Sequence, residues 1–409
     1  MKALTNMLSR WIAPAMLVLG LAAAPAASAT VVSTQFSTLG QHRFVVPAGV
    51  RSVKAVLVGG SGGSAYNVFS VYVVPGGDGG VAAATVAVTP GQVLFAQVAG
   101  NGLSGSANGG GGGAPGAGHA GQRAGAGGGG GASVLRRCSI APASPRYCGT
   151  GKVLSSRILV AGGGGGAGGD SDTPSQHGGE GGSAGAPAGG GLADGQGDDP
   201  GQGGQPGDQS AGGQAGDISE PTALPTDGRL GVGGNGGGQW AGGGGGGGAG
   251  LYGGGGGGGG QAAGAHGAGG GGGGGSSGVP AGTSGVSGLS TLVSSPGTPP
   301  SVMLIWTLPA PTVFTRAAAR ISSQAATLRG VGNPNGSPVT NCHFTLARAG
   351  HPAVSIPCRE QVGGGSRPVQ VSARPSHLNP GTRYKVRLTV RTTQGSRTGG
   401  LISFRTAAS

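Results

Sequence analysis

The feature that most constrains this chain is a stretch from Asn108 to Gly275 in which glycine dominates. Residues 231–275 alone contain 31 glycines in 45 positions. Glycine buries almost no apolar area, and fixing its backbone costs about 1–2 kcal/mol per residue, so side-chain packing cannot order the stretch. It is therefore either a flexible tether or a bundle of left-handed, three-residue-per-turn helices whose backbones hydrogen-bond to one another.

Strand-like segments surround and interrupt the glycine. Apolar alternation and Pro-Gly turns predict β-strands at residues 42–47, 52–58, 81–88, 93–99, 132–135, 157–161 and 302–306. The glycine segments are then insertions between strands of a β-sandwich. Because residues 231–275 are enclosed between two predicted strands, we expect them to be ordered by backbone hydrogen bonds.

Five segments occur in an order that resembles that of a known family. The segments are Val46–Val50, Val56–Gly60, Thr89–Gln92, Gly127–Ala132 and Ile158–Gly166. Their order is similar to that in the glycine-rich domain of bacterial surface proteins and in the glycine-rich extracellular region of the anaplastic lymphoma kinase and leukocyte tyrosine kinase receptors. The resemblance covers about residues 35–307 and implies a jelly-roll, tumour-necrosis-factor-like sandwich carrying inserted polyglycine helices. Those receptors bind protein ligands through this region, but no residue here carries that activity across.

The N-terminus has the pattern of an export signal. Lys2 and Arg10 precede an apolar run over residues 11–24, and Ala27-Ser28-Ala29 supplies the small residues of a cleavage site. This predicts a signal peptide at residues 1–29 and a secreted, extracellular protein, with cell-wall association as one form of it. No later run is long enough to predict a transmembrane segment.

Four cysteines fit an oxidising compartment. Cys138 lies near Cys148, and Cys342 lies near Cys358, so local pairing predicts two structural disulfides, one in each half of the chain. Metal binding is the alternative, but the gaps lack the short spacing of a zinc knuckle.

Residues 170–228 form an acidic insertion with ten carboxylates and no lysine or arginine. Their spacing matches no calcium-binding loop. Glycine recurs almost every third residue over 201–216, but proline is scarce, which disfavours a collagen triple helix. We expect a solvated, unfolded segment.

A second domain is predicted at residues 311–409, after a proline-rich linker. Strands are expected at residues 325–331, 339–346, 369–373, 383–390 and 401–406. The segments Asn333–Val339, Cys342–Phe344 and Leu378–Tyr384 resemble the fibronectin type III-like domain of actinobacterial exported proteins. The resemblance implies that Tyr384 braces a corner and that Phe344 replaces the usual core tryptophan.

Two motifs suggest catalysis only weakly. Gly59–Gly63 matches a nucleophile elbow, but no helix follows it, and Gly149–Val153 lacks the hydroxyl residue of a phosphate-binding loop. No pair of histidines has a metal-ligand spacing; the seven are His42, His119, His177, His266, His343, His351 and His377. We expect no catalytic site, no cofactor and no metal.

Positive charge is concentrated in the second domain. From Pro311 onward, twelve arginines and one lysine oppose one glutamate, which gives 13 − 1 = +12 of the chain's net +13. Arg383, Lys385, Arg387 and Arg391 alternate along one strand and so share a face. This predicts binding to an anionic cell-wall polymer or polysaccharide. Nucleic acid is disfavoured, and the remaining alternatives are a membrane surface, the acidic insertion and a merely solubilising face.

These features together favour a secreted, non-enzymatic cell-surface or extracellular-matrix protein with a structural or adhesive role. The glycine-rich domain, residues 30–308, would act as a presenting scaffold. The alternative is a binding module that recognises a protein or carbohydrate ligand through the glycine-rich domain.

Overall fold

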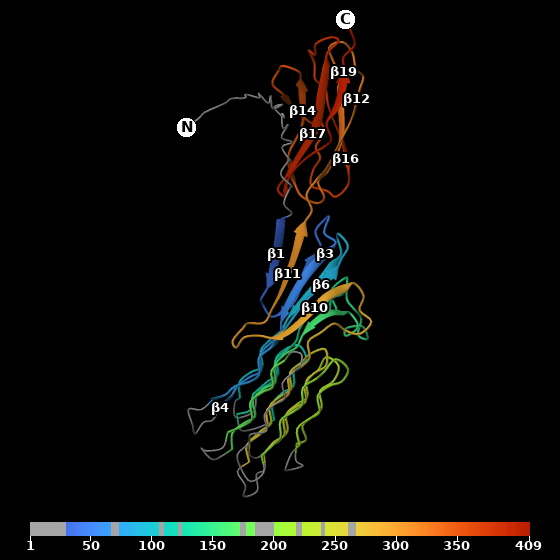
Figure 1. Ribbon diagram of the computed structural model, residues 1–409. Coiled ribbons are helices and arrows are strands. Elements are labelled where there is room, and N and C mark those ends of the chain that lie inside the picture. Colours follow the sequence, from blue (N-terminus) through green and yellow to red (C-terminus); the bar gives the residue numbers. More distant parts are fainter. Residues whose placement is uncertain are drawn as a thin grey trace, which may run out of the picture.

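The computed structural model describes residues 30–66, 73–105, 110–121, 125–171, 177–184, 200–217, 223–238, 242–260 and 267–409. Its regular structure consists of strands, with no helix in any of these ranges, so the predicted all-β class is confirmed. The predicted signal peptide lies outside them. Figure 1 shows the C-terminal strands, a first set of sheets and the extended glycine segments following one another along an elongated molecule.

The first half of the chain forms two antiparallel sheets that share one hydrophobic core. One has the order β1 (Thr30–Phe36), β11 (Ser301–Leu308), β3 (Ser52–Val58), β6 (Gly80–Ala87) and β10 (Val286–Val293); the other has β2 (Gly40–Val45), β7 (Val93–Val98), β8 (Ser133–Arg136) and β9 (Arg157–Ala161). A short pair, β4 (Ala65–Tyr66) and β5 (Val73–Val74), stands apart from both sheets. Leu57, Leu94 and Leu159 are fully buried between the sheets.

The edge strands β1 and β10 were not predicted from the sequence. Most side chains of β10 are exposed on both faces, Leu292 to 64%, and its pairing with β6 shifts register between Ser287 and Ser290. A strand that buries neither face has no period-two pattern to detect. The bulge and the exposed serines also fit an edge strand that must avoid pairing with other chains.

Backbone hydrogen bonds with a three-residue period hold the glycine segments together. Within residues 163–169, successive amides donate to different neighbours, and every third amide donates to the same one. Residues 163, 166 and 169 donate to segment 243–249, residues 164 and 167 to segment 60–63, and residues 165 and 168 to segment 179–182. Each segment therefore bonds neighbours on three sides, and side chains contribute little to its packing.

The spacing between these segments leaves no room for side chains at most positions. A methyl group built on Gly165 would lie 1.9 Å from the carbonyl oxygen of Gly272. Such a contact is far inside van der Waals distance, and the obstacle is backbone that is itself hydrogen-bonded. Glycine is thus required here by close approach of neighbouring backbones.

The expectation that the acidic insertion is unfolded was wrong for the residues that the structure describes. The amides of Gly201, Gly204 and Gly207 donate to carbonyls of residues 268, 271 and 274, so this segment belongs to the glycine bundle. Its carboxylates close turns: Asp208 Oδ1 accepts from the amides of residues 210 and 211, and these hydrogen bonds lower the pKa of Asp208. Asp172, Asp194, Asp198, Asp199 and Glu220 lie outside the described residues.

Two buried arginines, one on β8 and one on β9, donate hydrogen bonds to groups outside their own strands. Arg157, 3% exposed, donates through Nη1 to the carbonyls of Gly250 and Leu251 in the glycine bundle. Arg136, 4% exposed, donates to the Gln97 side chain and to the Val153 carbonyl. Burial, and then the nearby charge of Arg157, lower the pKa of Arg136 to about 10. Carbonyl dipoles therefore replace water around both cations.

The second half of the chain forms another pair of antiparallel sheets around a separate core. One sheet has the order β12 (Thr312–Ala319), β13 (Thr327–Asn333) and β16 (Val369–Ala373); the other has β15 (Val354–Pro357), β14 (Val339–Arg348), β17 (Arg383–Thr392) and β18 (Gly395–Thr398), with β19 (Ile402–Arg405) also paired to β17. Phe344, Leu328 and Leu388 are fully buried in this core. The sequence analysis missed β12, β15 and β18.

Tyr384 has the structural position expected of it. It is 5% exposed, its hydroxyl oxygen accepts a hydrogen bond of 2.9 Å from the Asn379 amide, and its ring stacks on Phe404. The hydroxyl thus satisfies a backbone donor in the turn that precedes β17.

The two halves of the chain also meet through turns. A methyl group built on Gly336 would lie 2.0 Å from the Ala48 carbonyl oxygen, and one on Gly49 would lie 2.2 Å from the Asn335 carbonyl oxygen. The Asn335 side chain donates to the Ala310 carbonyl at 2.6 Å. Backbone contact therefore supplements the covalent linker at this junction.

We expect Gly165→Ala to lower the free energy of unfolding by about 2 kcal/mol or more, because the added methyl group must displace bonded backbone. The control is Gly151→Ala, since a methyl group on Gly151 meets nothing within 4 Å. Thermal or urea unfolding measured for both variants tests this. Equal stability of the two variants would show that the bundle is not packed this closely.

Candidate functional site

The four cations singled out in the sequence lie on one face of β17. Along this strand exposed and buried residues alternate, with Arg383, Lys385, Arg387 and Arg391 exposed. Their intervening neighbours, including Leu388, are buried in the core. Burial of one face of the strand forces the cations onto the other. We call these four residues the β17 row.

Strand pairing extends the β17 row to a fifth cation that the sequence analysis missed. Arg405 on β19 is the register partner of Arg383, so the two side chains point to the same face. The Nε of Arg405 donates to the Gly381 carbonyl at 2.8 Å, which holds the guanidinium in place. Because Arg405 is distant in sequence, only the β17–β19 pairing reveals it.

The neighbours of the β17 row are neutral. Its register partners on β14 and β18 are Asn341, Thr345, Ala347 and Ser396, and Ser403 on β19 lies opposite Lys385. No carboxylate within the described ranges lies at ion-pair distance from the row. Like charges on adjacent positions destabilise a sheet, and they are only partly screened at a Debye length of about 8 Å. The cations of this face therefore repel one another without compensation from a neighbouring carboxylate in the described residues.

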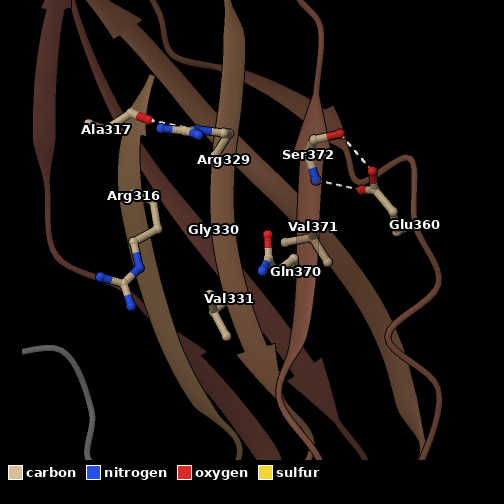
Figure 2. A pocket seen from close by; sticks show the side chains of 9 residues that line it. All are labelled: Arg316, Ala317, Arg329, Gly330, Val331, Glu360, Gln370, Val371 and Ser372. Atoms are coloured by element: carbon tan, nitrogen blue, oxygen red, sulfur yellow. Dashed lines mark hydrogen bonds between the residues drawn. The ribbon is translucent and has the colours of Figure 1, made fainter. Parts of the chain in front are cut away.

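A hollow of about 620 Å³ lies on the opposite sheet of this domain. Figure 2 shows Arg316, Arg329, Gln370 and Ser372 on its strands and Glu360 on the loop beside it. The Nε of Arg329 donates to the Ala317 carbonyl at 3.2 Å. This hollow is a second place where cations gather outside the core.

Glu360 is the single carboxylate of this domain, and Ser372 engages both of its oxygens. The Ser372 amide donates to one oxygen, and the Ser372 hydroxyl donates to the other at 2.7 Å. Partial burial pushes the pKa of Glu360 upward, but the hydrogen bonds from Ser372 outweigh it, so the pKa is lowered. Glu360 stays ionised at neutral pH and holds its loop against β16.

A smaller hollow, about 390 Å³, opens on the glycine bundle. Its lining includes the polar side chains of His119, Asp227, Arg229 and Asn235. The side chains of Asn235 and Asp227 accept hydrogen bonds from the backbone amides of residues 119 and 215, so the wall of the hollow is built by the bundle itself.

The structure contains both expected disulfides. Cys138 and Cys148 are joined with their Cα atoms 5.1 Å apart, and Cys342 and Cys358 with theirs 5.5 Å apart. The first closes the loop between β8 and β9, and the second joins β14 to the end of β15.

Metal and membrane features are absent where the structure describes the chain. No group of three or more His, Cys, Asp or Glu side chains comes together there to hold a metal ion. The same ranges include no helix that could cross a bilayer. Of the motifs with weak catalytic resemblance, Gly59–Gly63 runs into the glycine bundle, where the amides of Gly60 and Gly63 bond neighbouring segments.

Comparison with known proteins does not assign the chain to a family. No protein-family model matches it, and no curated protein does. Among solved structures, it is similar to the sensor domain of the anti-sigma factor RsgI4 from Pseudobacteroides cellulosolvens. A short form of that domain is 21% identical over 25% of this chain and 99% of its own length, with a TM-score of 0.21; a long form is 22% identical over 24% and 91%, with a TM-score of 0.18. Similarity this weak says nothing about activity.

We expect Arg383→Gln to stabilise the protein slightly at low salt, by less than about 1 kcal/mol, because it removes one member of the Arg383–Arg405 like-charge pair. The gain should shrink as salt is added. Urea unfolding at low and high salt measures it, with the exposed, non-strand Arg374→Gln as control. A loss of stability on neutralising Arg383 would contradict this account of the β17 row.

Proposed function

We propose that this chain is an exported, non-enzymatic protein of a cell surface or extracellular matrix, attached to an anionic polymer through its C-terminal domain. The observation that carries the proposal is the β17 row together with Arg405. These five cations share one face, and no carboxylate of the described residues lies at ion-pair distance from them. A solubilising surface would gain nothing from concentrating like charges on one strand.

The geometry of the row suits a repeating polyanion. Alternate residues of a strand are spaced by about 7 Å, so Arg383, Lys385 and Arg387 present charge at that interval on a rigid support, and Arg391 follows after the neutral Thr389. A polymer with charges at comparable spacing contacts several cations at once and releases its condensed counterions. Anionic cell-wall polymers and acidic polysaccharides have this character.

The first half of the chain is proposed to be a scaffold of the glycine-rich surface-protein type. The three-residue hydrogen-bond period and the bonding to three neighbours support polyglycine helices. The two sheets around one core support a jelly-roll, tumour-necrosis-factor-like sandwich over residues 30–308, similar to the glycine-rich receptor region. The second core and the Tyr384 hydrogen bond support a fibronectin type III-like domain over residues 311–409. The predicted signal peptide and the two disulfides support export.

Replacing Arg383, Arg387 and Arg391 with glutamine should abolish retention of the full chain on immobilised heparin or purified anionic wall polymer at low salt. Retention of the unaltered chain should fall steeply as salt rises, because each phosphate, sulfate or carboxylate contact releases counterions.

The matched control replaces Arg359, Arg367 and Arg374 with glutamine, which removes the same charge from exposed positions outside β17. If both triple variants lose retention equally, net charge and not the row is responsible. If the unaltered chain is not retained even at low salt, attachment through this face is ruled out.

A second candidate function is recognition of a protein or carbohydrate ligand by the glycine-rich half. The hollow that contains His119, Asp227, Arg229 and Asn235 favours it, because charged and hydrogen-bonding side chains line one concave surface there. Its backbone-bonded walls are pre-organised, which reduces the ordering cost of binding.

An array of purified glycans and peptides probed with the full chain tests this second function. We expect a bound species whose signal disappears in Arg229→Gln and persists in the β17-row triple variant. Binding that follows only the β17 row would assign recognition to the other half of the chain.

A further inference from the structure

The hollow of Figure 2 lies on a sheet face that carries two ordered rows of side chains. Strand registers place Arg316, Arg329 and Ser372 side by side across β12, β13 and β16. Two residues along each strand, the same registers place Phe314, Val331 and Gln370 side by side. Alternate residues of paired strands point to one face, so a cationic row lies beside an apolar row that ends in an amide.

The cationic row is not neutralised by the fold. Arg316 and Arg329 are direct cross-strand partners, and neither forms an ion pair within the described part of the chain. Both carboxylate oxygens of Glu360 accept hydrogen bonds from Ser372, and neither is paired with an arginine. The Nε of Arg329 is fixed by the Ala317 carbonyl, which sets the direction of its guanidinium. Figure 2 shows the guanidinium of Arg316 directed away from Ala317, so an anion in the hollow reaches both cations once the exposed Arg316 side chain turns toward Arg329.

The apolar row is exposed, although its composition would suit a core. The Phe314 side chain is 59% exposed. The guanidinium of Arg316 lies 6.0 Å from the centre of its ring, so the two rows touch. Gln370, exposed at the end of this row, offers both a donor and an acceptor. The hollow itself is lined by two arginines, Val331, Gln370 and the hydrogen-bonded Glu360, and Phe314 lies beside it on the same face of the sheet. Together they are complementary to a ligand that has an apolar face, a negative charge and hydroxyl groups.

We propose that this hollow binds one carboxylate-bearing sugar unit. The carboxylate is held by Arg316 and Arg329, the C–H face of the ring lies on Phe314 and Val331, and the hydroxyls bond Gln370. The volume of about 620 Å³ accommodates a monosaccharide and lies within the range of small-molecule sites, about 300–1,000 Å³. The site is on the opposite sheet from the β17 row and does not depend on polymer attachment there.

Titration of the full chain with D-glucuronate, followed by backbone amide chemical shifts of Gln370, Val371 and Ser372, tests the proposal. D-glucose is the uncharged control, and inorganic phosphate represents a simple anion. We expect saturable shifts with glucuronate, none with glucose, and weaker binding of phosphate, which cannot use the apolar row.

Three variants separate the contributions. Arg316→Gln with Arg329→Gln should weaken glucuronate binding by at least about tenfold, because both charge-assisted hydrogen bonds are lost. Phe314→Ala should weaken glucuronate binding and leave phosphate binding unchanged. The β17-row triple variant should bind glucuronate as the unaltered chain does.

Any of four results would overturn the proposal: no saturable shift with glucuronate, an equal response to glucose, retained binding in the double arginine variant, or loss of binding in the β17-row variant. If phosphate binds as tightly as glucuronate and Phe314→Ala affects neither, the hollow is a simple anion site. Retention on the polymer is measured separately, so the two proposals fail independently.

Discussion

Backbone-to-backbone hydrogen bonding in the glycine segments is the constraint on which the rest of the first half depends. Because segments such as 163–169 donate to neighbours on three sides, backbone amides and carbonyls take the stabilising role that side chains have in an ordinary core. The close approach of these backbones excludes other residues at positions such as Gly165. The bundle is joined to the sheets by side chains from outside it, as when Arg157 on β9 donates to the carbonyls of Gly250 and Leu251.

Period-two burial made β17 and its charged face predictable, since one buried face dictates the other. The exposed strand β10 lacks that pattern, and no local signal could place it. The partners Arg405 and Arg316 were missed because cross-strand registers are non-local. The acidic insertion was misjudged although its signal was present: glycine at almost every third position, too poor in proline for collagen, fits the three-residue period of the bundle.

The C-terminal sandwich keeps its charge on two outer faces that differ in character. The β17 row is linear and flanked by neutral side chains, which suits a repeating charge pattern. The hollow on the other sheet combines two cations with Val331 and Gln370, and Phe314 lies beside it, which suits the shape of one unit. The sandwich keeps the two faces on separate sheets, so the two proposed sites would bind their ligands independently.

A bundle stabilised by peptide groups also has an unusual dependence on temperature. The heat-capacity change of unfolding rises with exposed apolar area and falls with exposed polar area. The glycine segments bury mostly amides and carbonyls, so their unfolding adds little positive heat capacity. Their stability curve should be flatter than that of a hydrophobic core, and the scaffold should be less sensitive to cold than the sandwiches that it adjoins.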